Sequence, residues 1–97
     1  MVVIAKRTIN EFIEKHPGSA GPLLDWYLKT KDCDWSNFAD VRQLFGSADS
    51  VGNGLYVFNI GGNKYRLIGR IIFGARTVFI RFIGTHKAYD KVDLSGL

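Results

Sequence analysis

The residues from Tyr56 to Asp90 constrain the fold more than any other part of the chain, because polar and apolar side chains alternate along most of this stretch. Successive side chains of a β-strand point to opposite faces of a sheet, so the alternation is typical of half-buried strands. We therefore predict consecutive antiparallel strands over residues 56–83. Tight turns are expected at Gly61-Gly62 and at Gly74-Ala75-Arg76.

The middle strand of this stretch has two different faces. One face is apolar and consists of Tyr65, Leu67, Ile71 and Phe73. The other mixes cations with aliphatic side chains and consists of Lys64, Arg66, Ile68, Arg70 and Ile72. We expect the first face to be buried. The second face places cations on a rigid element, which suits a polyanionic ligand.

The first part of the chain predicts a short strand followed by a helix. Residues 1–5 are apolar and β-branched, which favours a strand that pairs with the later sheet. Thr8 and Glu11 have the spacing of a capping box, so we place the start of the helix at Thr8. The helix ends before Pro17.

Two more helices are expected before the sheet. Ser19 is the predicted cap of the second, which ends near Asp32. Ser36 or Asn37 opens the third, which ends at Gly46. Residues 46–54 are predicted to be a polar loop that closes with an Asn-Gly turn. The order of these elements predicts an α+β fold for residues 1–97 as a single domain, in which an N-terminal helical hairpin packs on an antiparallel-rich sheet.

The charges are distributed unevenly along the chain, whose net charge is +4. Residues 1–54 carry six Lys or Arg and seven Asp or Glu, a net charge of −1. Residues 55–97 carry seven and two, a net charge of +5. This asymmetry indicates an anionic partner, with nucleic acid as the first candidate. A solvated sheet face that serves only solubility is the alternative.

Several classes of protein do not fit the composition. Cys33 is the only cysteine, so the chain forms no internal disulfide, and with two histidines it lacks the ligands of a closed zinc site. No run approaches the roughly 20 apolar residues that span a bilayer. We therefore expect a cytoplasmic protein. The Gly61-Gly62-Asn63 turn lacks the spacing of a nucleotide-binding loop, and the basic half has only Asp90 and Asp93 as carboxylates. Any catalysis is expected to need neither metal nor cofactor.

The cations and a histidine at the end of the predicted sheet suit the cleavage of RNA. These residues are Lys64, Arg66, Arg81, His86, Lys87 and Tyr89. Cleavage without a metal needs a base for the 2′-hydroxyl, cations for the phosphorane charge and an acid for the departing 5′-oxygen. Histidine exchanges protons near neutral pH, and Lys and Arg supply fixed positive charge.

Two motifs in this half, VFNIGGNKYRLI and GTHKAYD, resemble the HigB toxins of the RelE superfamily, the mRNA interferases of bacterial toxin–antitoxin pairs. VIAKRTINEF and DWYLKTKDCDW extend the resemblance over most of the chain. The resemblance implies the small RelE-like α+β fold. It also implies ribosome-dependent cleavage of translated mRNA in the A site of the 70S ribosome, and neutralisation by a HigA-like helix-turn-helix antitoxin.

The resemblance also suggests roles for individual residues. Catalytic roles are implied for Lys64, Arg66, His86 and Tyr89, and contacts with RNA or the ribosome for Asn63, Arg70, Arg81 and Lys87. RelE relies on arginine, lysine and tyrosine, whereas this chain offers a histidine, so the assignment of acid and base stays open between His86 and Tyr89. Two alternatives remain at this point: a gyrase inhibitor like the ParE toxins of the same superfamily, and a non-catalytic RNA-binding module.

Overall fold

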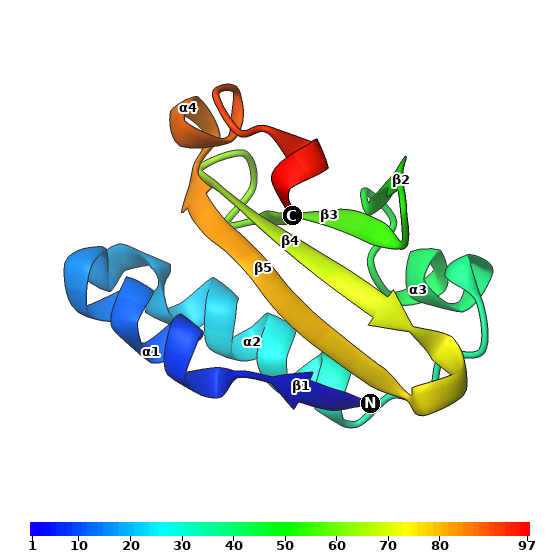
Figure 1. Ribbon diagram of the computed structural model, residues 1–97. Helices are drawn as coiled ribbons and strands as arrows, with labels where there is room; N and C mark the ends of the chain where they lie inside the picture. Colours follow the sequence, from blue (N-terminus) through cyan, green and yellow to red (C-terminus); the bar gives the residue numbers. More distant parts are fainter.

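The computed structural model describes residues 1–97 and contains one five-stranded sheet in the order β1-β5-β4-β3-β2 (Figure 1). Its strands are β1 (Val2–Ile4), β2 (Asp49–Gly52), β3 (Leu55–Ile60), β4 (Tyr65–Ile72) and β5 (Thr77–Thr85). β1 pairs in parallel with β5, and the other neighbours are antiparallel. The predicted first strand and the consecutive antiparallel strands over residues 56–83 are confirmed.

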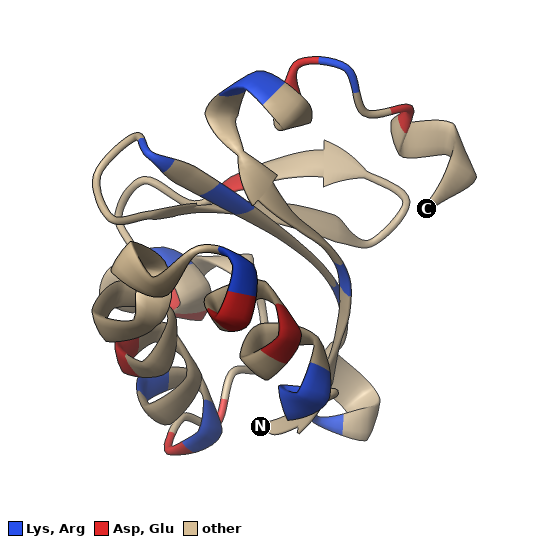
Figure 2. Cartoon of the chain, turned by 90° about the vertical axis from the view of Figure 1, so that its left-hand side faces the viewer, with Lys and Arg blue, Asp and Glu red and all other residues tan.

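Helices cover one face of this sheet. They are α1 (Lys6–Lys15), α2 (Ala20–Lys31) and α3 (Phe38–Leu44), with the short α4 (His86–Tyr89) beyond β5. Three 3₁₀ turns complete the chain: η1 (Pro17–Ser19), η2 (Phe73–Ala75) and η3 (Leu94–Gly96). η1 joins α1 and α2 into a hairpin that lies against the sheet in Figures 1 and 2. The predicted α+β fold with an N-terminal helical hairpin is confirmed.

The main core lies between the helices and the sheet. Its fully buried members include Ile9, Leu23, Trp26, Phe58 and Leu67. The predicted burial of one face of β4 is confirmed. Leu67 and Ile71 lie in this core, and Tyr65 and Phe73 pack against it. Burial of such side chains is the largest favourable contribution to folding.

The other face of the sheet, called the open face below, is only partly covered. A second, smaller core forms there from Leu55, Val57 and Ile68. The C-terminal segment, residues 89–97, packs over it through Tyr89, Val92, Leu94 and Leu97. Figure 2 shows the resulting order of layers, with the sheet between the helices and this segment. The open face therefore remains accessible at the two ends of the strands and along the middle of β5, where Arg81 is exposed.

Two predicted helix caps are wrong. α1 begins at Lys6, and Ala5 at its N-cap position makes no side-chain cap. Thr8 lies within the first turn, where its backbone N–H donates to the carbonyl oxygen of Ala5. Ser19 precedes α2 but its hydroxyl donates to the carbonyl oxygen of His16 at 2.6 Å. Only Asn37 caps as expected, accepting from the backbone N–H of Asp40 at the start of α3.

The segment predicted as a polar loop contains an edge strand. Residues 49–52 form β2, which pairs with β3 despite their polar side chains. The Asn53-Gly54 turn between them is confirmed, and both residues have positive φ angles of 54° and 73°. Such a turn matches the twist of the flanking strands and holds even a polar segment in the ladder. No helix in the structure has the length and apolar character needed to cross a membrane.

Candidate active site

The pairing of β4 with β5 brings together residues that are distant in the sequence. Arg66 lies directly across from Gly84, and Tyr65 lies across from Thr85. Just beyond these pairs, the backbone N–H of His86 donates to the carbonyl oxygen of Lys64 at 3.1 Å. The start of β4 and the start of α4 therefore meet at one end of the sheet. Lys64, Arg66, His86 and Tyr89 gather there and are called the cationic site below.

Arg66 is the most firmly held member of the cationic site. Its side chain is half-buried on the open face, and its Nη1 donates to the Oδ1 of Asn59 on β3. Its guanidinium lies over the ring of Tyr89, 5.4 Å from the ring centroid. Its Nε is buried and has no partner within the protein. A guanidinium that is held from two sides is already ordered before an anionic ligand arrives.

Gly84 on β5 lies directly across from Arg66 on β4. The ring of Phe82 folds over Gly84 so closely that a Cβ at this position would collide with the ring. The Phe82 ring occupies the space that a side chain at position 84 would take. A larger residue at this position would have to displace the ring.

His86 is placed by the short helix α4. Thr85 caps this helix, its Oγ1 accepting from the backbone N–H of Ala88 at 3.1 Å. The Nδ1 of His86 lies 3.5 Å from the Oδ2 of Asp90, one helical turn later. The carboxylate faces one ring nitrogen, and the side chain remains exposed. This arrangement can orient the imidazole.

The remaining predicted contact residues fall into two groups. Asn63 and Lys87 are exposed and adjoin the cationic site. Arg70 lies four residues along β4 from Arg66, roughly 13 Å away at the usual rise of a strand. It donates to the backbone oxygens of Asn53 and Leu97. Arg81 also lies outside the cationic site.

Arg81 occupies a β-bulge that strand periodicity does not reveal. Ile68 pairs with Phe82 and Gly69 with Ile80, so Arg81 is an extra residue with no partner on β4. Its exposed guanidinium lies over the ring of Phe79, 5.4 Å from the centroid. Strict alternation along β5 would put Phe79 and Ile83 on the same face, but the bulge turns Ile83 to the helix-covered core.

Two polar residues of the site were not identified from the sequence. Asn59 interrupts the apolar strand β3, and the register places it directly opposite Arg66. Asp90 follows His86 by four residues, a spacing that faces it only if the segment is helical. A polar residue inside an apolar strand was the available signal for Asn59. No comparable signal marked Asp90, because α4 is too short to show a periodic pattern.

The cationic site has an excess of positive charge. The ion pairs elsewhere in the chain join Arg7 to Glu11, Lys29 to Asp25 and Arg76 to Asp34. None involves Lys64, Arg66 or Lys87. In Figure 2 the strands β4 and β5 carry blue segments, whereas the helices carry both signs. No group of three His, Cys, Asp or Glu side chains is arranged to hold a metal ion.

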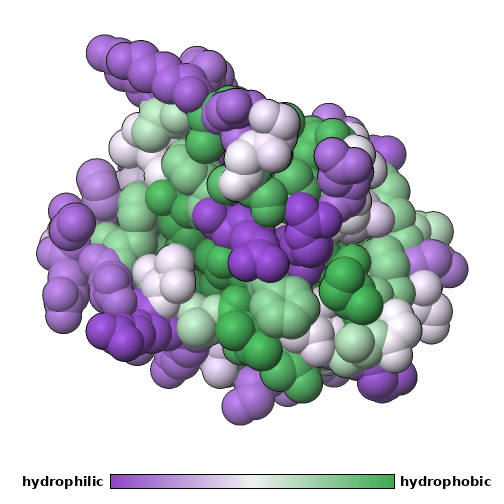
Figure 3. All heavy atoms as spheres, viewed as in Figure 1, coloured by the Kyte–Doolittle hydropathy of each residue, from purple (hydrophilic) through white to green (hydrophobic).

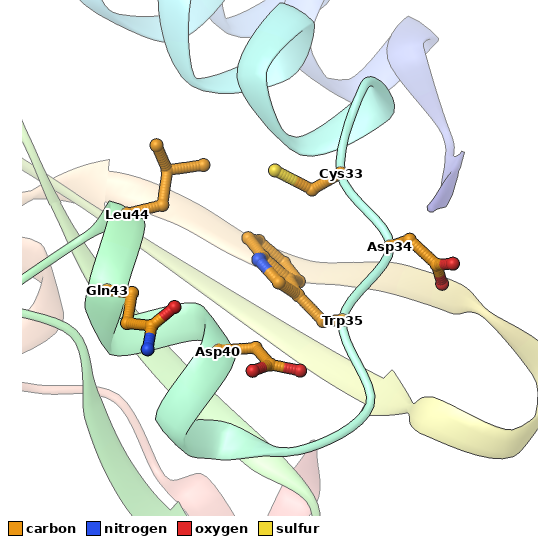
Figure 4. A pocket seen from close by; sticks show the side chains of 6 residues that line it. All are labelled: Cys33, Asp34, Trp35, Asp40, Gln43 and Leu44. Carbon is orange, nitrogen blue, oxygen red and sulfur yellow. The ribbon is translucent and has the colours of Figure 1, made fainter.

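A separate hollow of about 400 Å³ lies between the end of α2 and α3 (Figure 4). It is lined by Cys33, Asp34, Trp35, Asp40, Gln43 and Leu44. Its two carboxylates are already engaged, because Asp34 pairs with Arg76 and Asp40 accepts from the backbone N–H of Ser36 at 2.8 Å. The hollow contains no cation and no residue of the cationic site.

Comparison with known proteins shows a consistent pattern. Residues 19–92 match the family model of HigB toxins, described as the RelE-like toxic component of a toxin–antitoxin system. The chain is 33% identical over 94 residues to the mRNA interferase HigB of Escherichia coli O6:H1 (strain CFT073), covering 95% of this chain and 91% of that protein. It is 27% identical over 92 residues to the mRNA interferase toxin HigB of Escherichia coli K12 and to an mRNA interferase HigB of Shigella flexneri, covering 93% of this chain and 88% of each.

Proposed function

The chain belongs to the HigB family of RelE-like toxins, and on this basis we propose that it is a toxin that cleaves mRNA. The relatives are named mRNA interferases, which favours an endoribonuclease over a gyrase inhibitor or a non-catalytic RNA-binding module. The observation that carries the proposal is the cationic site, where a fixed arginine, a lysine, a histidine and a tyrosine meet at the accessible end of a sheet.

The proposed reaction is attack of an RNA 2′-oxygen on the adjacent phosphorus. A base removes the proton of the 2′-hydroxyl as the new O–P bond forms. The bond from phosphorus to the 5′-oxygen breaks, and an acid gives that oxygen a proton. The products are a 2′,3′-cyclic phosphate and a 5′-hydroxyl, so no water or metal is consumed. This chemistry needs one proton acceptor, one proton donor and positive charge near the phosphorane.

His86 and Tyr89 are the proposed proton-transfer groups. An imidazole can take up or release a proton in catalysis, and Asp90 lies 3.5 Å from the Nδ1 of His86, where it can orient the ring. A phenol can donate a proton or orient a hydroxyl. His86 is therefore our choice for the general acid or base, with Tyr89 as its partner.

Arg66 and Lys64 are the proposed electrostatic groups. Charge that develops on the phosphorane oxygens is stabilised most by donors that are already in place before the reaction. The bond to Asn59 and the contact with the Tyr89 ring hold Arg66 in this way. Lys64 adds a second cation from the adjacent turn, and Asn63 and Lys87 extend the positive surface toward RNA or the ribosome.

The proposed substrate is mRNA in the A site of the 70S ribosome. The site lies on an exposed end of the sheet and lacks base-reading pockets, so the ribosome is expected to present the RNA. Ribosomes translate in the cytoplasm, where we infer that the protein acts. A toxin of this kind requires an antitoxin in its own host, and we infer a HigA-like protein with a helix-turn-helix domain.

Mapping of new mRNA 5′ ends after induction tests the proposal. We expect cuts within translated codons, carrying 5′-hydroxyl groups, and none in an untranslated transcript of the same cell. Intact mRNA with blocked replication would overturn the proposal in favour of a gyrase inhibitor. Cuts that appear equally in translated and untranslated RNA would mean that cleavage does not depend on the ribosome.

A further inference from the structure

The end of the open face opposite the cationic site has an apolar surface, called the apolar strip below. It consists of Val2, Ile4, Ile72 and Phe79. The strand register places these side chains together. Ile4 on β1 pairs with Phe79 on β5, and two residues away Thr77 on β5 pairs with both Val2 on β1 and Ile72 on β4. Cross-strand partners point to the same face of a sheet, so the strip is continuous across β1, β5 and β4.

No part of the chain covers this strip. Val2, Ile4 and Ile72 are 56%, 45% and 42% exposed. The C-terminal segment covers Leu55, Val57 and Ile68 farther along the same face. In Figure 3 hydrophobic atoms gather over β1 and the neighbouring part of the sheet, beside a hydrophilic cluster over the middle of β4 and β5. Adjacent exposed aliphatic side chains on a sheet mark an interaction surface.

Two arginines border the strip. Arg81 leans on the ring of Phe79, 5.4 Å from its centroid, and its side chain is exposed. Arg70 is the cross-strand partner of Phe79 on its other side. Arg70 donates to the backbone oxygens of Asn53 and Leu97, so Arg81 is the arginine whose guanidinium has no acceptor within the chain. A partner that fits this surface therefore combines apolar side chains with acidic ones.

We propose that the apolar strip is the docking surface for the antitoxin, which contributes a segment of apolar residues flanked by Asp or Glu. This proposal rests on the proposed function, because it presumes that the chain is a toxin with an antitoxin. A polyanion such as RNA gains little from exposed aliphatic side chains, and its natural place is the cationic site. A second copy would bring the same two arginines to this surface and no carboxylate, so it lacks the acidic groups that complement Arg81.

A double variant on the strip tests the proposal against a matched variant elsewhere. Ile4→Glu/Ile72→Glu places two carboxylates on the strip. Leu24→Glu/Leu28→Glu makes the same change on the outer surface of α2, where these leucines are 37% and 57% exposed. The antitoxin encoded beside the toxin gene serves as the probe. We expect the strip variant to bind it about 10²-fold more weakly or worse, since two isoleucines lose their burial. The control variant keeps wild-type affinity.

Growth and cleavage assays separate this proposal from the proposed function. The strip variant is expected to cleave mRNA like the wild type, but co-expressed antitoxin no longer rescues growth. If the wild type itself fails to cleave mRNA, the proposed function is wrong. If the wild type cleaves and the antitoxin still binds and rescues the folded strip variant, the docking proposal is wrong. A wild-type dimer that the strip variant dissociates, or cleavage lost while antitoxin binding persists, also overturns it.

A pair of variants with opposite charges at position 72 provides a second test, in which the loss of apolar burial is the same for both variants. Ile72→Glu and Ile72→Lys remove the same isoleucine at an exposed position, so both are expected to fold. An acidic partner segment tolerates Ile72→Lys and is repelled by Ile72→Glu, which separates the two dissociation constants by about tenfold. Equal constants, or tighter binding of Ile72→Glu, would contradict an acidic partner.

Discussion

The two ends of the β4–β5 pair carry opposite kinds of surface on the same face of one sheet. At one end Arg66 is held by Asn59 and by the ring of Tyr89, so a polar group is already ordered by its neighbours. At the other end Ile4 and Ile72 are 45% and 42% exposed. Between the two ends the C-terminal segment covers the sheet.

The difference shows how one small sheet can serve two partners. Chemistry requires side chains fixed before the substrate arrives, and the cationic site meets this need with internal hydrogen bonds. Docking requires apolar area that stays free until the partner arrives, and the apolar strip meets that need by having no internal partner. The comparison predicts that changes at one end alter cleavage and changes at the other end alter binding of the antitoxin.

One of the two largest effects is expected from Arg66→Ala, which removes the fixed cation. The single-turnover rate of cleavage on programmed ribosomes should fall about 10²–10³-fold, the usual cost of losing a donor to a developing oxyanion. Arg70→Ala is the matched control, because Arg70 lies on the same strand and face but outside the cationic site. It should weaken binding to the ribosome while the bound toxin still cleaves near the wild-type rate. If Arg66→Ala and Arg70→Ala slow cleavage by the same factor, the two ends of the open face do not differ in their contribution to catalysis.

His86→Ala is expected to lower the same rate by about 10²–10⁴-fold, because a positioned proton-transfer group is lost. It should also flatten one limb of the pH–rate profile, which Arg66→Ala leaves in place. Asp90→Asn should have a smaller effect, since it removes the negative charge that faces Nδ1 and leaves the imidazole itself in place. An unchanged rate in folded, ribosome-bound His86→Ala would assign the proton transfer to Tyr89 or Lys87, and Tyr89→Phe would then decide between them.

Much of the fold was predictable from the sequence because local patterns agree with the final packing. Alternation along β4 determined which side is buried, and the Asn53-Gly54 and Gly61-Gly62 turns adopt the positive φ angles that their residue types favour. The failures arose where pairing overrides local preference. β2 is a strand because it can pair with β3, and the start of α1 is determined by its connection to β1 rather than by Thr8.

The catalytic roles of Lys64, Arg66, His86 and Tyr89 remain predictions, drawn from their residue types and from the family resemblance. The structure brings these four residues to one end of the sheet. Arg70 and Arg81 lie apart from them, and the bulge at Arg81 arises from the alignment of two strands rather than from either alone. Asn59 was missed for the same reason, because its role depends on the register between β3 and β4.

A smaller effect is expected from Asn59→Ala, which frees Arg66 on one side. Cleavage should fall about tenfold, because a hydrogen bond to a charged group is worth about 1.5–3 kcal/mol and tenfold corresponds to 1.4 kcal/mol. As a positioning residue, Asn59 should leave the pH profile unchanged. Asn59→Asp keeps an acceptor oxygen and should restore thermal stability but not the full rate, since its charge offsets the field of Arg66. A wild-type rate in Asn59→Ala would mean that the Tyr89 ring alone positions Arg66.

The smallest expected effect concerns Asp93, at the start of the turn that covers the middle of the open face. The Oδ1 of Asp93 accepts from the hydroxyl of Ser95 at 2.6 Å and from its backbone N–H at 3.0 Å. These bonds, the side-chain bond first, lower the pKa of Asp93 below its ordinary value of 3.8. A lowered pKa stabilises the fold above pH 3.8, and the contribution disappears as the pH falls through the lowered pKa.

Thermal unfolding measured between pH 7 and pH 2.5 should therefore show Asp93→Ala slightly less stable than the wild type near neutral pH, with the difference vanishing in acid. Ser95→Ala is the matched control, because it removes the larger cause of the pKa shift and keeps the carboxylate. Ser95→Ala should therefore lose less thermal stability than the wild type as the pH falls from 7 to 2.5. Since Leu94 and Leu97 pack over Leu55 and Val57, loosening of this turn should also speed amide hydrogen exchange in β3. Unchanged exchange in Asp93→Ala would mean that the apolar contacts alone keep the segment in place between the cationic site and the apolar strip.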